Sequence, residues 1–324
     1  MKASSAFAAR RWAPSLPFRD FAPPALLVLL IVVVEFFAPG FVTRDTLVMV
    51  LADTAVLFLL ATAETFVILL GGVDLSIQAI ASLASVLMAQ LLPSIGALAL
   101  PVTILAGLVF GIMSGVVHVR LRVPSFVATL ATGGVVAGLA LLAARGRAIT
   151  IEEGGRAYTD WINASLFGLP SVVLISVFVG LAAFWVLRYT RFGRFSVAVG
   201  AGEPAAWAAG VNVNRTKITA FAASGMLSAV AGVVLAARLS SGSPTLANQL
   251  MLPAIAAVIV GGTAITGGLG NVGRTAVGAL IISIVRIGMT FIGVNIFAEN
   301  IVFGTMLIAA VAVTIDRSKI AIIK

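Results

Sequence analysis

The sequence predicts an all-α protein that crosses a membrane about ten times. Of its 324 residues, 60% are hydrophobic and only 10% are charged, and the mean hydropathy is +1.15. Soluble domains carry about 25% charged residues, so this chain lacks the polar surface that a water-facing exterior needs. Its charges separate apolar stretches that are long enough to cross a hydrocarbon core about 30 Å thick. These observations exclude a soluble globular fold.

Five spans are predicted in the first half of the chain, each bounded by charged or turn-forming residues. The first contains Glu35 as its only ionisable group and ends before Pro39-Gly40. Residues 75–119 hold no Lys, Arg, Asp or Glu, which leaves room for two spans with a turn near residues 93–96. The five spans are 21–38, 47–70, two within 75–119, and 123–144.

Five further spans are predicted in the second half, at residues 161–187, 218–237, 251–265, 275–293 and 300–315. Two segments of small and polar residues, Gly71–Ser76 and Gly261–Thr263, fall at membrane depth and predict broken helices. Breaks of this kind usually line a cavity. They therefore indicate transport.

The basic residues predict that both termini are cytoplasmic. Placing the termini inside puts 15 of the 21 Lys and Arg residues in inner segments, as the positive-inside rule requires. The net charge of +9 then reflects inner loops, and nucleic-acid binding is not expected because no polar domain presents a basic face. We expect cytoplasmic tails at 1–20 and 316–324 and one transmembrane domain at 21–315. Its longest polar loops are 145–160 outside and 188–217 inside.

Several kinds of chemistry are excluded by composition. The chain has no cysteine and one histidine, which excludes disulfides, thiolate ligands and multi-histidine metal sites. Residues 268–275 fit the spacing of a phosphate-binding loop, but Arg274 stands where lysine is needed and no nucleotide-binding fold surrounds it. We expect no catalytic residue, metal site or cofactor in this chain.

Charged residues inside the predicted spans need partners. Asp53 and Glu64 are eleven residues apart, which places them on nearly the same helix face. Burying each carboxylate costs about 2.5–3.5 kcal/mol on insertion scales. Arg286, in the ninth span, and Arg238 are the candidate partners. A structural ion pair and a proton relay both fit this pattern.

The inner segment 188–217 contains a short predicted helix. Glu203-Pro204 opens it and Gly210 ends it, and five basic residues flank it. Such a helix indicates a docking site for another protein. A helix lying on the lipid surface is the alternative, but the alanine-rich faces give it little amphipathic character.

Four motifs resemble the ribose-type permeases, the membrane subunits of bacterial ATP-binding-cassette (ABC) importers for monosaccharides. They are Phe66–Ser76, Val123–Thr132, Gly200–Asn212 and Gly261–Gly268. The resemblance runs in unbroken order from about residue 47 to 315. It implies a multi-pass protein of the bacterial inner membrane.

The resemblance also implies partners and contact residues. It implies two permease copies, identical or similar, around a central pathway, with a periplasmic sugar-binding protein above. Two cytoplasmic ATPase subunits below would bind ATP and Mg. The positions that match the family's coupling helix, which contacts the ATPase, are Gly200, Glu203, Ala205, Ala206, Gly210 and Asn212.

Polar or flexible positions near the breaks are the expected pathway residues. They are Asp74, Ser76, Thr129, Asn248 and Gln249, with Phe126 as an apolar wall. Three other functions stay open at this point. They are an ABC permease for nucleosides or branched-chain amino acids, a proton-coupled secondary transporter using Asp53 and Glu64, and a structural membrane subunit. The predicted docking helix favours an ABC permease.

Overall fold

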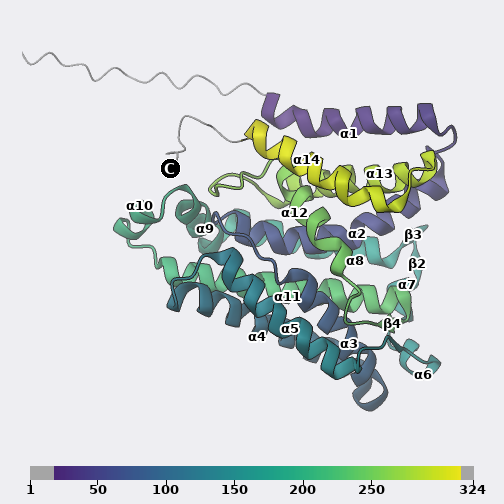
Figure 1. The fold of residues 1–324 in the computed structure, drawn as a ribbon, viewed down its shortest axis with the longest axis horizontal. Helices are drawn as coiled ribbons and strands as arrows, with labels where there is room; N and C mark the ends of the chain where they lie inside the picture. The colour runs from purple at the N-terminus through teal and green to yellow at the C-terminus, as the bar shows by residue number, and fades with distance from the viewer. Residues whose placement is uncertain (1–17, 315–324) are drawn as a thin grey trace, which may run out of the picture.

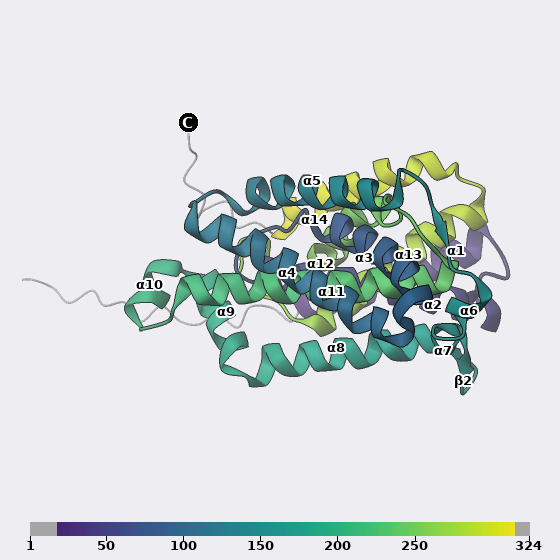
Figure 2. The ribbon, with the colours of Figure 1, turned by 90° about the horizontal axis from the view of Figure 1, so that it is seen from below.

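The computed structural model describes residues 18–314, most of which are helical. Long helices lie side by side along the long axis of one bundle (Figures 1 and 2). Residues 1–17 and 315–324 lie outside the described part. They include most of the predicted tails at 1–20 and 316–324.

Ten helices of ten or more residues form the body of the bundle, within the described part of the chain. They are α1 (Phe18–Phe37), α2 (Arg44–Ile68), α3 (Ile77–Ile95), α4 (Ala99–Arg120), α5 (Ser125–Ala144), α8 (Ser171–Tyr189), α11 (Val213–Leu239), α12 (Met251–Val260), α13 (Val272–Ile292) and α14 (Glu299–Thr314). One more helix of eleven residues, α9 (Arg191–Ala201), lies at the end of the bundle together with the short helix α10 (Glu203–Ala208).

The opposite end of the bundle carries the short helices α6 (Glu153–Arg156) and α7 (Asp160–Asn163) (Figure 1). Two small antiparallel strand pairs lie in the same region. They join β1 (Ile149–Thr150) to β4 (Ser241–Gly242) and β2 (Ser165–Leu166) to β3 (Leu169–Pro170). We call the two ends the α10 end and the hairpin end.

Six described segments are long and apolar enough to cross a membrane: 44–68, 77–120, 125–144, 171–189, 213–239 and 272–292. The longest of them contains both α3 and α4, which pack against each other across a turn at Gly96. Three shorter apolar helices cover 21–37, 248–260 and 299–312. The prediction of an all-α, multi-pass membrane protein is confirmed.

Helices α2 and α11 form the centre of the bundle, and α11 packs against α2, α3 and α4. Glycines allow α4 and α11 to approach closely. A Cβ atom on Gly111 would lie 2.3 Å from the carbonyl oxygen of Phe221, and one on Gly225 would lie 2.3 Å from that of Gly107. Small residues at a helix crossing allow this close approach of the two backbones.

We expect Gly111→Ala to destabilise the bundle, because the added methyl group would push α4 and α11 apart. Overpacking of this kind costs about 1–3 kcal/mol in the free energy of unfolding. Gly304→Ala is the matched control, since a Cβ there meets nothing within 4 Å. The measurement is the thermal unfolding midpoint of each variant in detergent. Equal midpoints would contradict the close crossing.

The predicted span at 251–265 is a shorter helix, α12, which begins partway along the bundle. Residues 243–250 lead to it along α3 as an irregular segment that ends in one turn of 3-10 helix, η2 (Asn248–Leu250) (Figure 1). Ser85 Oγ accepts a hydrogen bond from the backbone of Ser243 at 3.1 Å, and Ser82 Oγ accepts one from Ala247 at 3.0 Å. Irregular backbone inside a membrane needs such partners. The helix ends at Val260 because the chain turns at Gly262, whose φ is +98°.

Candidate functional site

The first predicted break is present between α2 and α3, at residues 69–76. Gly71 has a φ of +77°, and a Cβ atom added to it would lie 3.0 Å from the Thr266 carbonyl oxygen. Two side chains of α5 satisfy the exposed backbone of the break. Ser125 Oγ accepts from the Val73 N–H at 3.1 Å, and Thr129 Oγ1 accepts from the Leu75 N–H at 3.0 Å. Helix α5 is therefore fastened to the break.

Asp74 connects the break to the centre of the bundle. Its carboxylate accepts hydrogen bonds from the backbone of Ser76 at 2.9 Å and from Ser224 Oγ, on α11, at 2.7 Å. Glu64 Oε1 accepts from the Asp74 N–H at 3.1 Å. Asp74, Ser76, Thr129, Ser224 and Glu64 are all fully buried. Three expected pathway residues thus lie inside one hydrogen-bonded network.

Asp53 and Glu64 have different surroundings although they share one helix. Asp53 forms an ion pair with Arg286 of α13, and the nearby Arg238 donates to the Ala52 carbonyl oxygen at 2.9 Å. Glu64 forms no ion pair with either arginine, and its Oε2 has no hydrogen-bond partner among the described residues. The predicted arginine partner is therefore present for Asp53. For Glu64 the prediction is wrong, because this residue lies beside the break and not beside an arginine.

We expect Arg286→Leu to lower the free energy of unfolding by about 3 kcal/mol, since it leaves Asp53 as a part-buried carboxylate without its cation. The double variant Asp53→Leu with Arg286→Leu should recover most of that loss. The measurement is thermal unfolding of the single and double variants in detergent. A double variant that is no more stable than the single one would show that the pair is not the source of the effect.

The predicted short helix is present as α10, at one end of the bundle (Figure 2). Glu203 begins it, Pro204 follows, and Gly210, with φ of +83°, lies just beyond its end. Glu203 forms an ion pair with Lys217 of α11. The Trp207 side chain is 74% exposed on α10. Trp207 was not among the residues expected to contact the ATPase. Of those that were, Ala206 is buried, Ala205 is exposed, and Asn212 Oδ1 caps α11 by accepting from the Arg215 N–H at 2.9 Å.

Three motifs that are far apart in the sequence meet behind α10. A Cβ atom on Gly200 would lie 1.9 Å from the Leu69 carbonyl oxygen and 2.5 Å from the Gly268 nitrogen. The Gly268 N–H donates to that same Leu69 oxygen at 2.9 Å, and Gly267 lies against both Gly71 and Gly200. The glycine at 267 is a site residue that the sequence analysis missed. This glycine belongs to the motif at 261–268, but nothing in that motif indicates which segment the glycine contacts.

The remaining expected pathway residues are exposed. Phe126 is 53% exposed at the start of α5, and Asn248 and Gln249 are exposed where the irregular segment leads into α12. On α5, a Cβ atom added to Gly134 or Gly138 would meet nothing within 4 Å. Helix α5 and the irregular segment lie on the same side of the bundle, which faces the viewer in Figure 1 and upward in Figure 2. We call this surface the α5 face.

A multi-pass helical bundle with helices broken inside it is the construction of a membrane transport protein. Comparison with known proteins agrees with this class. The family model described as branched-chain amino acid transport system / permease component matches residues 46–311. The chain belongs to this family of permease components, and it is a multi-pass protein of the inner membrane.

Several similar curated proteins are sugar permeases. The ribose import permease protein RbsC of Haemophilus influenzae is 34% identical over 291 residues, which cover 88% of this chain and 90% of the relative. The RbsC protein of Bacillus subtilis is 36% identical over 298 residues, 91% of this chain and 92% of the relative. The L-arabinose permease AraH of Azospirillum brasilense is 33% identical over 289 residues, 88% and 84% respectively. No solved structure matches the chain.

Proposed function

We propose that this chain is the membrane-spanning subunit of an ABC importer that carries a monosaccharide, or a related small polar solute, across the inner membrane. The observation that carries the proposal is similarity to ribose and arabinose permeases over almost the whole chain. A short exposed helix held on the transmembrane bundle fits the same function. A secondary transporter would not need that helix.

The orientation follows from the basic residues. Arg188, Arg191, Arg194 and Arg215 flank α10, so we place the α10 end in the cytoplasm. Counting α3 and α4 separately, and including α1, α12 and α14, gives ten crossings with both termini inside. The hairpin end then faces the periplasm, where a sugar-binding protein would deliver the solute.

The proposed motor is a separate cytoplasmic ATPase subunit that contacts α10. Trp207 is a large exposed apolar side chain there, of the kind that anchors protein interfaces. ATP and Mg would bind to that partner, and this chain would hold no cofactor. Closure of the ATPase pair on ATP would move α10, and the helices would alternate access between the two sides.

The α5 face is the proposed contact with a second permease copy. Asn248 and Gln249 are exposed just before α12 begins, partway along the bundle. Side-chain amides at that depth would be costly to place against lipid, where they find no hydrogen-bond partner. A water-filled pathway between two copies would solvate them, and open glycines on α5 would allow close approach. Asp74 and Ser76, which lie behind α5, and Thr129, on the buried side of α5, would reach this pathway when α5 moves away from the break.

We expect Gly134→Cys to form a disulfide-linked dimer when membranes are oxidised, because Gly134 lies on the α5 face. The chain contains no cysteine of its own, so a single introduced thiol reports one position. Phe178→Cys is the matched control, since Phe178 is 73% exposed on α8, on another side of the bundle. The measurement is the band pattern in non-reducing electrophoresis. Cross-linking at Phe178 and not at Gly134 would place the contact elsewhere.

Purification of the tagged chain in mild detergent tests the proposed function. We expect an ATPase subunit to co-purify, and a periplasmic sugar-binding protein loaded with its sugar to raise the ATP hydrolysis rate. A chain that is recovered alone, and that accumulates solute in liposomes only under a proton gradient, would overturn the proposal. That result would favour a proton-coupled transporter instead.

A further inference from the structure

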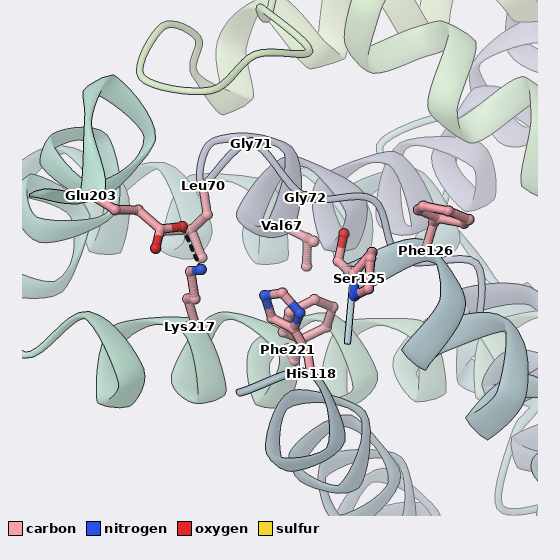
Figure 3. Close-up of a pocket in the computed structure, with 11 residues that line it drawn as sticks. Val67, Leu70, Gly71, Gly72, His118, Ser125, Phe126, Glu203, Lys217 and Phe221 are labelled. Carbon is pink, nitrogen blue, oxygen red and sulfur yellow. Dashed lines mark ion pairs between the residues drawn. The ribbon is translucent and has the colours of Figure 1, made fainter. Parts of the chain in front are cut away.

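A cavity of about 300 Å³ lies at the α10 end, beneath the break that follows α2. Figure 3 shows the Glu203–Lys217 ion pair at one side of it and Ser125 at the other, with His118 and Phe221 between them. Gly72 forms part of the wall, where a Cβ atom would lie 3.1 Å from Val67 and 3.2 Å from Ser125 Oγ. Five separate segments, from α2, α4, α5, α10 and α11, therefore meet around one space.

The cavity contains both donors and acceptors of hydrogen bonds. His118 Nδ1 lies 2.6 Å from the Val123 carbonyl oxygen, which can only accept, so Nδ1 carries the proton of that bond. Nε2 makes no hydrogen bond to any residue of the described range and is left for a ligand. The Lys217 ammonium donates, the Glu203 carboxylate accepts, and the Ser125 hydroxyl does both. Phe221 adds an aromatic surface beside His118, with ring centroids 5.6 Å apart.

These groups define a class of ligand. The one carboxylate and the one ammonium group form an ion pair with each other, so the cavity offers no unbalanced charge to a charged ligand. Its volume is at the lower end of the range for small-molecule sites, about 300–1,000 Å³. Alternating donors and acceptors beside an aromatic ring suit a neutral polyhydroxyl compound the size of a monosaccharide.

The cavity is also connected to α10. Glu203 is both a lining residue and the first residue of that helix, and its partner Lys217 lines the same space. A ligand that hydrogen-bonds to this pair would stabilise the conformation in which the cavity exists. By linkage, it would oppose any movement of α10 that closes the cavity.

We propose that this cavity is a cytoplasmic sugar site, at which the imported monosaccharide binds after crossing and slows further turnover by holding α10 in place. The inference rests on the proposed function as a sugar importer. It adds a second place where sugar acts, on the side where the sugar accumulates. Accumulated product would therefore limit its own import.

The test uses the complete transporter, with its ATPase and binding protein, in proteoliposomes whose ATPase subunits face outward. The probes are D-ribose and L-arabinose, added outside and therefore on the α10 side. We expect the stimulated ATP hydrolysis rate to fall as sugar is added. A transporter that imports one of these sugars, but whose ATPase rate is unaffected by either sugar on the α10 side, would overturn the site. A transporter that imports no sugar at all would overturn the proposed function instead.

Two variants locate the effect. His118→Asn keeps a donor near the Val123 carbonyl oxygen but removes the Nε2 position, so sugar should inhibit it with an affinity about three- to tenfold lower, as for one lost hydrogen bond. Thr219→Ala is the matched control, because Thr219 is exposed on α11, two residues from Lys217, and does not line the cavity. Inhibition that is equal in wild type, His118→Asn and Thr219→Ala would place the sugar site elsewhere.

Discussion

Replacing Glu203 with arginine is expected to reduce sugar import by about tenfold, a coupling loss within the usual range for communication between two sites. Glu203 begins α10 and forms an ion pair with Lys217 of α11. Arginine at this position would set two cations against each other and push the start of α10 away from α11. The measurement is uptake of radiolabelled sugar, together with the stimulated ATP hydrolysis rate of the purified complex.

The reversed pair provides the control for this prediction. In the double variant Glu203→Arg with Lys217→Glu, the two charges again attract, so import should recover in part. Uptake at the wild-type rate in the single variant, with the complex intact, would show that the position of α10 does not limit transport. Failure of the double variant to recover would assign the effect of Glu203 to its contact with the ATPase rather than to the ion pair.

The long helices were predictable because their ends carry strong local signals. The predicted span 123–144 differs from α5 by two residues, since Pro124 precedes the helix and Arg145, with φ of +51°, ends it. The short helix α10 was predictable for the same reason, from Glu203-Pro204 and Gly210. These signals lie within a few residues of the helix ends that they specify, so the helix ends can be predicted from the local sequence alone.

The position of the irregular segment before α12 was not predictable. Its backbone is satisfied by Ser82 and Ser85, which lie 165 and 158 positions away in the chain from Ala247 and Ser243. Nothing within the segment identifies those partners. The same limit applies to Glu64, whose helical spacing from Asp53 was correct but whose neighbour is the break at Asp74. Periodicity locates a side chain on a helix face, and only tertiary packing decides what that face meets.

The contact behind α10 combines local motifs, which the sequence shows, with a tertiary contact, which it does not. The motifs that contain Leu69, Gly200 and Gly268 were each visible in the sequence, but their contact was not. In the structure, Gly200 lies against the Leu69 carbonyl oxygen, and Gly268 donates a hydrogen bond to that oxygen at 2.9 Å. Backbone contact of this kind leaves no space for a side chain. It connects the segment that carries α10 directly to the broken helix and to the loop after α12.

We therefore expect Gly200→Ala to abolish import, because its methyl group would lie 1.9 Å from the Leu69 carbonyl oxygen and would force the three segments apart. Gly202→Ala is the matched control two residues away, where a Cβ atom meets nothing within 4 Å and φ is 169°, an extended value open to any residue. The measurements are sugar uptake and co-purification of the ATPase for both variants, with membrane insertion checked by quantitative blotting.

The two readouts separate folding from transmission of movement. If the Gly200→Ala protein inserts normally and still binds the ATPase, but import and stimulated ATP hydrolysis are both lost, the backbone contact transmits the movement of α10 to the bundle. If it fails to insert, Gly268→Ala carries the test. Its Cβ would lie 2.9 Å from the Ala201 backbone rather than 1.9 Å from a carbonyl oxygen, and the φ of +77° at this position adds the strain of a left-handed conformation. Normal import by both variants would show that the three segments can separate without uncoupling α10 from the broken helix.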